Sequence, residues 1–401
     1  MIFYALFCRT YQFIMKTASY FLPFHEPELL TGPGSLERLP ERILEKGANP
    51  VLLVVSRTVA RLPEYEVFRA GLDRADIRTV VYEGTVPNPT IANAEEALAL
   101  YLANNCKGII GIGGGSQMDC AKAIGARVAR PAKSISAMRG VLKVRKRLPP
   151  LFLVPTTAGT GSEVTIAAVL SNPDTHEKYA LNDPALIPAV AVLDPLLTIG
   201  LPPSITAATG MDALTHAIEA YIGRSNTNRT REMAIRATRM IVANVNTAYG
   251  DGGDVEARDK MLTASYYAGI AFTRAYVGYV HAIAHTLGGF YGIAHGVANA
   301  VILPYVLEAY GKKAEKSLAE LADALSLTDS AASDYEKAAA FIRKIRAMNA
   351  EMKIPEKIDG IRPEDIPVMA DRAFREANPL YPVPRIFDRE ELAALYRVIS
   401  V

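Results

Sequence analysis

The sequence has few cysteines, little net charge and no long apolar run. Its cysteines are an odd number, three, at unrelated spacings, so the sequence predicts no disulfide framework and a reducing, cytoplasmic environment. The 44 basic and 42 acidic side chains leave a formal charge of +2, which gives no reason to expect a nucleic-acid or membrane-surface partner. No apolar run approaches the roughly 20 residues that a membrane-spanning helix needs.

The first residues are apolar but lack the features of an export signal. Arg9 and Lys16 interrupt residues 1–24, which have neither a basic segment ahead of the apolar stretch nor a small-residue cleavage site. We therefore expect residues 1–14 to form an extension outside the fold, with Met15 as a second possible start. Residues 20–30 are a candidate edge strand that could pair between subunits, so we expect a homo-oligomer.

The 401 residues, half of them hydrophobic, are enough for two domains with separate cores. Five short apolar runs, typical of buried parallel strands, cover residues 51–55, 79–82, 108–112, 151–154 and 189–193. Helical patterns lie around them, at residues 36–46, 65–75, 90–105 and 118–128. This alternation predicts an α/β domain over residues 15–201, built on a parallel, Rossmann-like sheet.

From residue 204 onward helical patterns dominate. They cover residues 204–222, 229–248, 255–272, 297–310, 314–324 and 332–352. Pro202 and Pro203 interrupt the pattern ahead of the first of these helices. The sequence therefore predicts an all-α C-terminal domain over residues 202–401.

A glycine-rich turn follows the third predicted strand. Gly113, Gly114 and Gly115 lack Cβ atoms, so the backbone there can turn tightly and approach a ligand closely. The amides of Gly115 and Ser116 would lie at a helix N-terminus, which suits a pyrophosphate. A tight structural turn is the alternative, because Ser116 stands where the G-x-G-x-x-G pattern requires glycine. Asp119 could reach a cofactor or cap the helix.

A second polar loop, residues 155–165, follows the fourth predicted strand. It holds five hydroxyl side chains and two glycines in eleven residues. Hydroxyls and free amides suit ribose and phosphate in a neutral pocket. Ligands of open α/β sheets bind outside the carboxyl ends of the strands, where both loops are expected.

Four of the six histidines lie between residues 216 and 295. Asp212 and His216 are four residues apart and share one helix face, and His281 and His285 repeat that spacing. A glycine-rich break could bring His295 back over His281. One carboxylate with several imidazoles suits zinc or ferrous iron and leaves a coordination position for substrate. Spacing allows either His285 or His295 as the last ligand, and a histidine beside the metal could relay protons.

Several long motifs in a fixed order make the chain resemble the iron-containing (group III) alcohol dehydrogenase family. They are PNPT (87–90), GGGSQMDCAK (113–122), PTTAGTGSEVT (155–165), GMDALTHAIEAY (210–221), HAIAH (281–285), HGVANA (295–300) and NPLYPVPR (378–385). The resemblance extends from about Thr31 to the C-terminus. It implies a dehydroquinate synthase-like architecture with a nucleotide-binding α/β domain, a helical domain and the site in the cleft between them.

The resemblance also implies residue roles. The metal ligands would be Asp212, His216, His281 and His295, with iron as the family's metal and zinc an equally suitable ion. His285 becomes the neighbouring histidine, near substrate and nicotinamide. The cofactor, NAD or NADP, would be contacted by Asn88, Gly114, Gly115, Ser116, Thr156, Thr157, Thr160 and Lys178.

One position departs from the family pattern. After the first strand many NAD-using members carry an aspartate that binds the adenosine ribose, but here Ser56 and Arg57 follow. Ser56 cannot repel a 2′-phosphate and Arg57 could attract one, so we hypothesise that NADP is accepted, even preferred. The alternative is that Arg57 is an exposed charge and NAD binds without the carboxylate.

These features predict a metal-dependent, NAD(P)-linked alcohol dehydrogenase or aldehyde reductase that acts on short-chain alcohols or diols by hydride transfer. One alternative is a zinc-dependent glycerol dehydrogenase-like enzyme, against which the TTAGTGSE loop and the NPLYP tail argue. Another is a dehydroquinate synthase-like lyase, which would release no reduced cofactor. A non-catalytic binding protein is disfavoured by the intact ligand set.

Overall fold

The structure is a computed structural model that describes residues 2–172 and 177–401, and it divides into two compact units. The α/β unit comprises Pro23–Leu201 and Gly252–Tyr266. The helical unit comprises Met1–Leu22, Pro202–Asp251 and Tyr267–Val401. The chain therefore passes from the first unit to the second between Leu201 and Pro202, and its first residues belong to the helical unit.

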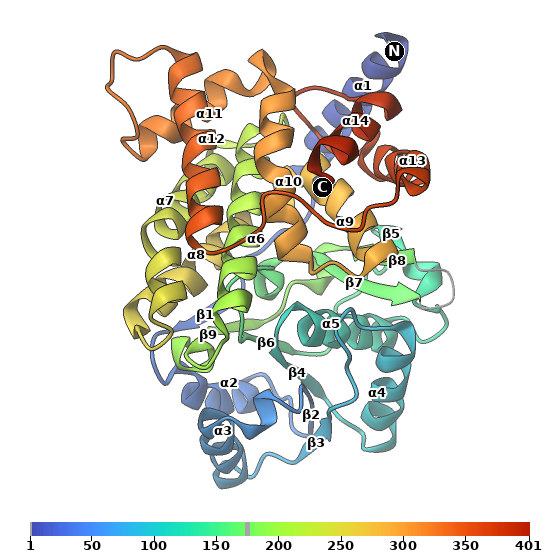
Figure 1. Ribbon diagram of the computed structural model, residues 1–401. Coiled ribbons are helices and arrows are strands. Elements are labelled where there is room, and N and C mark those ends of the chain that lie inside the picture. The colour runs from blue at the N-terminus through green and yellow to red at the C-terminus, as the bar shows by residue number, and fades with distance from the viewer. Residues whose placement is uncertain (1, 173–176) are drawn as a thin grey trace. The chain divides into compact units, whose positions relative to one another are not determined.

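The predicted parallel sheet is confirmed (Figure 1). Its six strands have the order β1-β9-β6-β4-β2-β3, and every neighbouring pair is parallel. The strands are β1 (Glu28–Thr31), β2 (Val51–Val55), β3 (Thr79–Tyr82), β4 (Gly108–Gly113), β6 (Leu151–Pro155) and β9 (Val190–Leu193). β1 lies at the sheet edge and is shorter than the expected strand over residues 20–30.

Helices cover both faces of this sheet, which is why its strands are continuous apolar runs. Side chains alternate along β2: Leu52 and Val54 pack into one core cluster, and Val51, Leu53 and Val55 into the other. The helices are α2 (Leu39–Glu45), α3 (Pro63–Arg74), α4 (Ile91–Ala103) and α5 (Gly115–Ala129). A small sheet that the sequence does not predict joins β5 (Gly140–Val141), β7 (Ala167–Asn172) and β8 (Glu177–Asn182).

The helical unit surrounds α6 (Pro203–Ile222), whose residues from Gly210 to Ile222 are all buried. A helix that is buried on all sides belongs at the centre of a helical core. The other helices are α7 (Asn228–Gly250), α8 (Val255–Ala275, shared with the α/β unit), α9 (Tyr279–Tyr291), α10 (His295–Tyr310), α11 (Lys312–Ala324), α12 (Asp334–Glu351), α13 (Ile366–Ala377) and α14 (Arg389–Ile399). Capping boxes at Thr227, Ser333 and Asp388 begin α7, α12 and α14.

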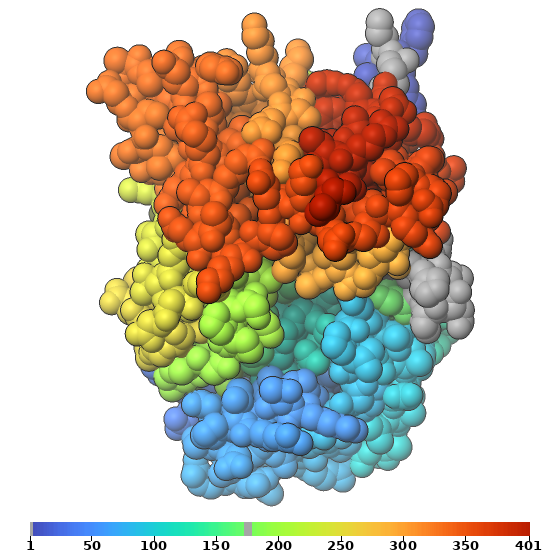
Figure 2. All heavy atoms as spheres, viewed as in Figure 1, coloured from blue at the N-terminus to red at the C-terminus, as the bar shows by residue number. Residues whose placement is uncertain are grey.

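The N-terminus corrects the expectation that residues 1–14 lie outside the fold. Residues 2–14 lie in helix α1 (Ile2–Ser19), which belongs to the helical unit (Figures 1 and 2) and contacts α13 through the stacked rings of Tyr4 and Phe374. Cys8 is fully buried and Gln12 is 5% exposed, so one side of α1 packs against the unit. The opposite side exposes large apolar residues, among them Phe3 and Phe13. This two-sided pattern is that of a packed amphipathic helix.

Among the described residues, no helix combines the length and apolar character that crossing a bilayer requires.

Candidate metal centre and nucleotide loops

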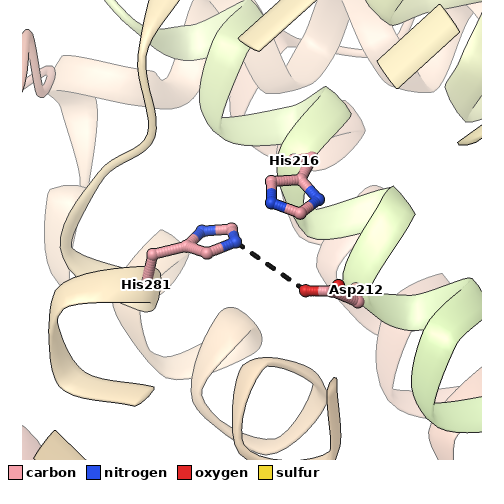
Figure 3. A group of neighbouring side chains, drawn as sticks. All are labelled: Asp212, His216 and His281. Atoms are coloured by element: carbon pink, nitrogen blue, oxygen red, sulfur yellow. Dashed lines mark ion pairs between the residues drawn. The ribbon is translucent and has the colours of Figure 1, made fainter. Parts of the chain in front are cut away.

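Three predicted metal ligands converge inside the helical unit. Asp212 and His216 lie one turn apart on α6, and His281 extends towards them from α9 (Figure 3). Their ligand atoms all lie within 4.8 Å of one another, and all three side chains are buried. The i, i+4 spacing on α6 therefore presents an oxygen and a nitrogen to one point, as the sequence predicts.

The fourth predicted ligand, His295, begins α10 and joins the group through Asp212. Its Nε2 lies 3.5 Å from Asp212 Oδ1, and its ring centroid is 5.4 Å from that of His281. Gly296 makes this approach possible, because a Cβ there would collide with the Ala208 carbonyl of α6. We call Asp212, His216, His281 and His295 the metal quartet.

The residues present fit a divalent metal ion. His281 Nε2 is buried and makes no hydrogen bond with the described residues, and it lies 3.8 Å from Asp212 Oδ1. Ligands that bind one ion tetrahedrally at about 2.1 Å are about 3.4 Å apart, close to the separations of His281 and His295 from this oxygen. The donor set of one carboxylate and imidazoles suits iron or zinc.

Glu219, which the sequence reasoning missed, holds His281 in place. Its Oε2 lies 2.6 Å from His281 Nδ1 and accepts a 2.7 Å hydrogen bond from the Gly278 amide. Its Oε1 accepts a 2.8 Å hydrogen bond from the Val280 amide. A carboxylate on the far nitrogen of a metal-binding histidine fixes its tautomer and ring orientation. The signal was present in the sequence, because Glu219 follows Asp212 by seven residues and shares its helix face.

Opposing charges set the protonation of this cluster. Burial by itself raises the pKa of Asp212, but the imidazoles of His216 and His295 hold that pKa well below its usual range. Burial by itself lowers the pKa of His281, but the carboxylates of Glu219 and Asp212 raise it to about 9. A protonated imidazole therefore balances the buried carboxylates without metal, and a divalent cation can replace that proton.

Asn299 and His285 complete the surroundings of the metal quartet. Asn299, one turn after His295 on α10, donates a 2.7 Å hydrogen bond from Nδ2 to Asp212 Oδ1. His285 stacks on His295 with ring centroids 5.1 Å apart. His285 Nδ1 lies 2.6 Å from Glu376 Oε1, to which the Tyr381 hydroxyl also donates, at 3.0 Å. No local pattern points to Glu376, which is 91 residues away from His285.

The two predicted nucleotide loops lie against each other in the α/β unit. Gly113 has a φ of 154°, and Gly114 and Gly115 lead into α5, whose first amides have no side-chain cap. A Cβ at Gly115 would lie 2.8 Å from Thr160 Cγ2, so the second loop needs glycine here. Ser116 Oγ accepts a 3.2 Å hydrogen bond from the Asn88 amide. Uncapped amides at the start of a long helix form an anion site.

The remaining threonines of the second loop follow β6 directly. The Thr156 amide donates to the Gly113 carbonyl at 2.9 Å, which extends the β4–β6 ladder into the loops. Thr157 Oγ1 would lie 3.5 Å from a Cβ at Gly114. The structure thus brings together Asn88, Gly114, Gly115, Ser116, Thr156, Thr157 and Thr160.

Two charged side chains of α5, Asp119 and Lys122, form hydrogen bonds to the second loop and to the residues that follow it. Asp119 Oδ1 accepts from the Ser162 hydroxyl at 2.7 Å, and its Oδ2 from the Val169 amide at 3.0 Å. The fully buried Lys122 ammonium donates to the Thr165 carbonyl and hydroxyl and to the Ala167 carbonyl. The carboxylate of Asp119 therefore links the loop, through the Ser162 hydroxyl, to β7, through the Val169 amide, a role that the sequence reasoning did not consider.

Two further predicted cofactor residues stand apart from these loops. Ser56 follows β2, the strand beside β4, and its hydroxyl accepts from the Val59 amide at 3.2 Å. Arg57, next to it, is exposed. Lys178 lies in β8, and its side chain falls outside the described residues.

The chain matches two family profiles that together span most of its length. Residues 27–195 match the profile described as iron-containing alcohol dehydrogenase. Residues 206–400 match the profile described as Fe-containing alcohol dehydrogenase family, C-terminal.

Individual relatives are similar over nearly their whole length. Alcohol dehydrogenase 4 of Saccharomyces cerevisiae is 39% identical to this chain, and the match covers 91% of this chain and 95% of the length of the yeast protein. The 1,3-propanediol dehydrogenase of Klebsiella pneumoniae is 36% identical over the same shares. A crystal structure of 1,3-propanediol oxidoreductase superposes with a TM-score of 0.90 at 35% identity, covering 94% of this chain and 99% of that one.

Proposed function

This chain belongs to the iron-containing alcohol dehydrogenase family and is an NAD(P)-linked alcohol dehydrogenase, and we propose that it acts on short-chain alcohols or diols at the metal quartet. The observation that carries this proposal is the convergence of Asp212, His216 and His281 within 4.8 Å, with His295 beside them. The comparisons support this function over a zinc-dependent glycerol dehydrogenase or a dehydroquinate synthase-like lyase.

The metal quartet would hold one ion, iron or zinc, which when bound supplies a Lewis acid for the alcohol or carbonyl oxygen. Glu219 keeps the Nε2 of His281 available, because it occupies Nδ1. Asn299 fixes the Asp212 carboxylate by donating a hydrogen bond to Oδ1, the oxygen that also faces His281 and His295. The quartet is thereby preorganised for an ion before that ion binds.

His285 is proposed as the group that handles the substrate proton. Glu376 engages its Nδ1, which leaves Nε2 as the nitrogen that can take up or release a proton. Its ring stacks on that of His295, one of the proposed ligands, so His285 lies beside the metal quartet. A histidine so placed can exchange the hydroxyl proton with solvent as the alcohol is oxidised.

The glycine-rich turn is proposed to bind the pyrophosphate of the cofactor. The uncapped amides at the start of α5 supply donors, and the absence of a Cβ at Gly114 and Gly115 leaves room for backbone to approach phosphate. Hydroxyls of Thr157 and Thr160 lie beside the same turn and are suited to cofactor hydroxyls. Hydride transfer then requires that these loops hold the nicotinamide rigidly.

A panel of alcohols and aldehydes, assayed after reconstitution with ferrous iron or with zinc, tests the function. We expect metal-dependent oxidation of short primary alcohols or of diols such as propanediol, with release of reduced cofactor. Metal-loaded protein that turns over none of these compounds would contradict the proposed substrate class. Turnover without release of reduced cofactor would instead favour a lyase.

We further propose that NADP is accepted, and even preferred. At the end of β2 the exposed Arg57 could pair with a 2′-phosphate, and Ser56 carries no charge that would repel it. Comparison of kcat/KM for NADPH and NADH decides the question, with Arg57→Ala as the matched variant. A strong NADH preference that Arg57→Ala leaves unchanged would contradict this proposal.

The assembly and compartment are proposals of the same kind. All three cysteines are free and buried, which suits a reducing compartment such as the cytoplasm. β1 has one partner in its sheet, β9, so its outer edge can accept a strand from a second copy of the chain. Light scattering on the purified protein tests for a homo-oligomer, and a monomer at micromolar concentration would contradict it.

A further inference from the structure

Helix α1 precedes the part of the chain that matches the family profiles, yet it contacts the tail motif at residues 378–385. We propose that α1 is a clasp that fixes this tail, and that Arg9 and Gln12 act through it as positioning residues for His285. This inference rests on the proposed function of His285. Every contact involved lies within the helical unit.

The polar side of α1 binds the tail through backbone carbonyls. Arg9 donates from Nη1 to the Val383 carbonyl at 2.8 Å and from Nη2 to the Pro384 carbonyl at 3.1 Å. Gln12 donates from Nε2 to the Tyr381 carbonyl at 2.8 Å and to the Pro379 carbonyl at 3.1 Å. Two side chains thus bind four carbonyls of a six-residue segment.

Arg9 and Gln12 also hold each other, because Arg9 Nη1 donates to Gln12 Oε1 at 2.8 Å. Both amide atoms of Gln12 are therefore used, and its side chain is almost fully buried. The pair lies one turn apart on α1, so its geometry depends on the helix. A flexible extension would lose too much conformational entropy in making these contacts one by one.

Packing attaches α1 to α13 as well. The ring of Tyr4 stacks on Phe374 with centroids 5.4 Å apart, and Cys8 is buried beneath the helix. Phe374 stands two residues before Glu376 on α13. The clasp therefore contacts both the tail and the helix that carries the partner of His285.

Helix α13 contacts His285 directly through Glu376, and the tail acts on His285 through the same carboxylate. The Tyr381 hydroxyl donates to Glu376 Oε1, the same oxygen that lies 2.6 Å from His285 Nδ1. Asn378 Nδ2 donates to the hydroxyl of Tyr279, the first residue of the helix that carries His285. Tyr381 thus has its backbone carbonyl held by Gln12 and its hydroxyl on the carboxylate that orients His285.

The clasp is suited to restrict motion rather than to fold the unit. Residues 378–388 between α13 and α14 form no helix or strand, so no regular ladder holds their carbonyls. Carbonyls released by Arg9 and Gln12 could bind water instead, at little cost in global stability. Local opening of the tail would increase, and with it the spread of His285 positions.

The double variant Arg9→Met/Gln12→Leu tests this proposal in the full chain. It removes the tail contacts while keeping side-chain length and helix propensity. Phe13→Gln is the matched control, because Phe13 is on α1 and 70% exposed. Hydrogen exchange of the Tyr381 and Val383 amides, metal content, and kcat and KM at full metal loading are measured for each.

We expect amide exchange in the tail to accelerate about 10-fold in the double variant. Metal content and cofactor KM should stay at wild-type values, and kcat should fall about 10-fold, since small misplacements of a catalytic group are costly. Phe13→Gln should match the wild type in all measurements. A merely structural role of Arg9 and Gln12 would not lower kcat while leaving cofactor KM and metal content unchanged.

Unchanged exchange in the double variant would overturn the clasp. Faster exchange with wild-type kcat would overturn the positioning role of Arg9 and Gln12. Failure of the proposed function looks different, because His285→Ala would then leave turnover unchanged while the exchange measurement still decides whether α1 holds the tail.

Discussion

The two units prepare for their ligands in opposite ways. The α/β unit offers backbone: uncapped amides at the start of α5, and a glycine, Gly115, where a Cβ would collide with Thr160. The helical unit offers side chains, with one carboxylate and three imidazoles from three helices. Backbone sites tolerate most side-chain changes and respond to shape, whereas a metal site fails when one donor is lost. Substitutions should therefore weaken cofactor binding by degrees but abolish metal binding.

Each unit also contains a carboxylate that positions other protein groups instead of contacting the ligand itself, and it is partly buried in the α/β unit and buried in the helical unit. Asp119 links the second nucleotide loop, at Ser162, to β7, at the Val169 amide. Glu219 fixes the start of α9 through the Gly278 amide and orients the His281 ring. In the first case the carboxylate positions a loop, and in the second a donor atom. The second role should be the more sensitive to substitution.

The largest effect is expected from loss of a metal ligand. His281→Ala removes a buried donor that no other described group can replace at the same point, so the protein should lose its ion and its turnover by at least about 1000-fold. Metal analysis of the purified variant, together with initial rates, measures both losses.

His285→Ala is the matched control on the same helix. It should retain metal and lose turnover about 100-fold, because a proton-handling group contributes about that factor. Loss of the ion from His285→Ala would show that the ligand set is wrong. Retention of the ion by His281→Ala would lead to the same conclusion.

A smaller effect is expected from Glu219→Gln, which keeps the shape but removes the charge. The amides of Gly278 and Val280 can still find an oxygen, so the helix should begin as before, while His281 loses the carboxylate on Nδ1. Metal affinity should fall about 10- to 100-fold, as for other partners of metal-binding histidines. Competition with a chelator measures it, and an unchanged affinity would show that Glu219 merely supports the fold.

Gly115→Ala tests the nucleotide-binding role of the α/β unit. The added Cβ would lie 2.8 Å from Thr160 Cγ2, so the two nucleotide loops must separate slightly. We expect cofactor KM to rise about 10-fold with metal content unchanged. Gly200→Ala in the same unit is the control, because a Cβ there meets nothing within 4 Å. Equal KM values for the two variants would contradict the assignment of the glycine-rich turn.

The sequence reasoning succeeded where structure is locally encoded. The runs that form β2, β4, β6 and β9 are apolar because helices cover both faces of the sheet, and this shows in any short window. Spacing alone paired Asp212 with His216 on one helix face. It left His281 with either His285 or His295, because the choice depends on how closely α10 approaches α6 at Gly296.

The parts that were missed depend on contacts between distant segments. Glu376 contacts His285 although 91 residues separate them in sequence, and no helix or strand periodicity can indicate such a contact. In sequence, residues 1–14 look like an extension outside the fold. Their packing becomes evident only from the hydrogen bond that Arg9 donates to the distant Val383 carbonyl. The strands of the small sheet, β5, β7 and β8, mix polar and apolar residues without clear alternation, so the sequence pattern does not predict them.

The smallest expected effect concerns two buried carboxyl groups whose pKa values are shifted in opposite directions. Neighbouring imidazoles keep the pKa of Asp212 low, but burial raises the pKa of Glu163, in the second nucleotide loop, to about 7. Its Oε2 is buried and makes no hydrogen bond with the described residues. Between about pH 4.3, the unfolded pKa, and pH 7 the folded state holds a proton that the unfolded state has released. Stability should therefore fall as pH rises through this window.

Glu163→Gln cannot ionise, so it should abolish that pH dependence. Relative to wild type we expect no gain at pH 5 and about 1 kcal/mol at pH 8, a modest figure because the buried Lys122 loses a neighbouring negative charge in the variant. Urea unfolding at the two pH values measures the difference, with the exposed Glu66→Gln as control. If Glu163→Gln is less stable than wild type at pH 8, Glu163 is ionised and paired there, and the α/β unit then holds its buried charges as the helical unit does.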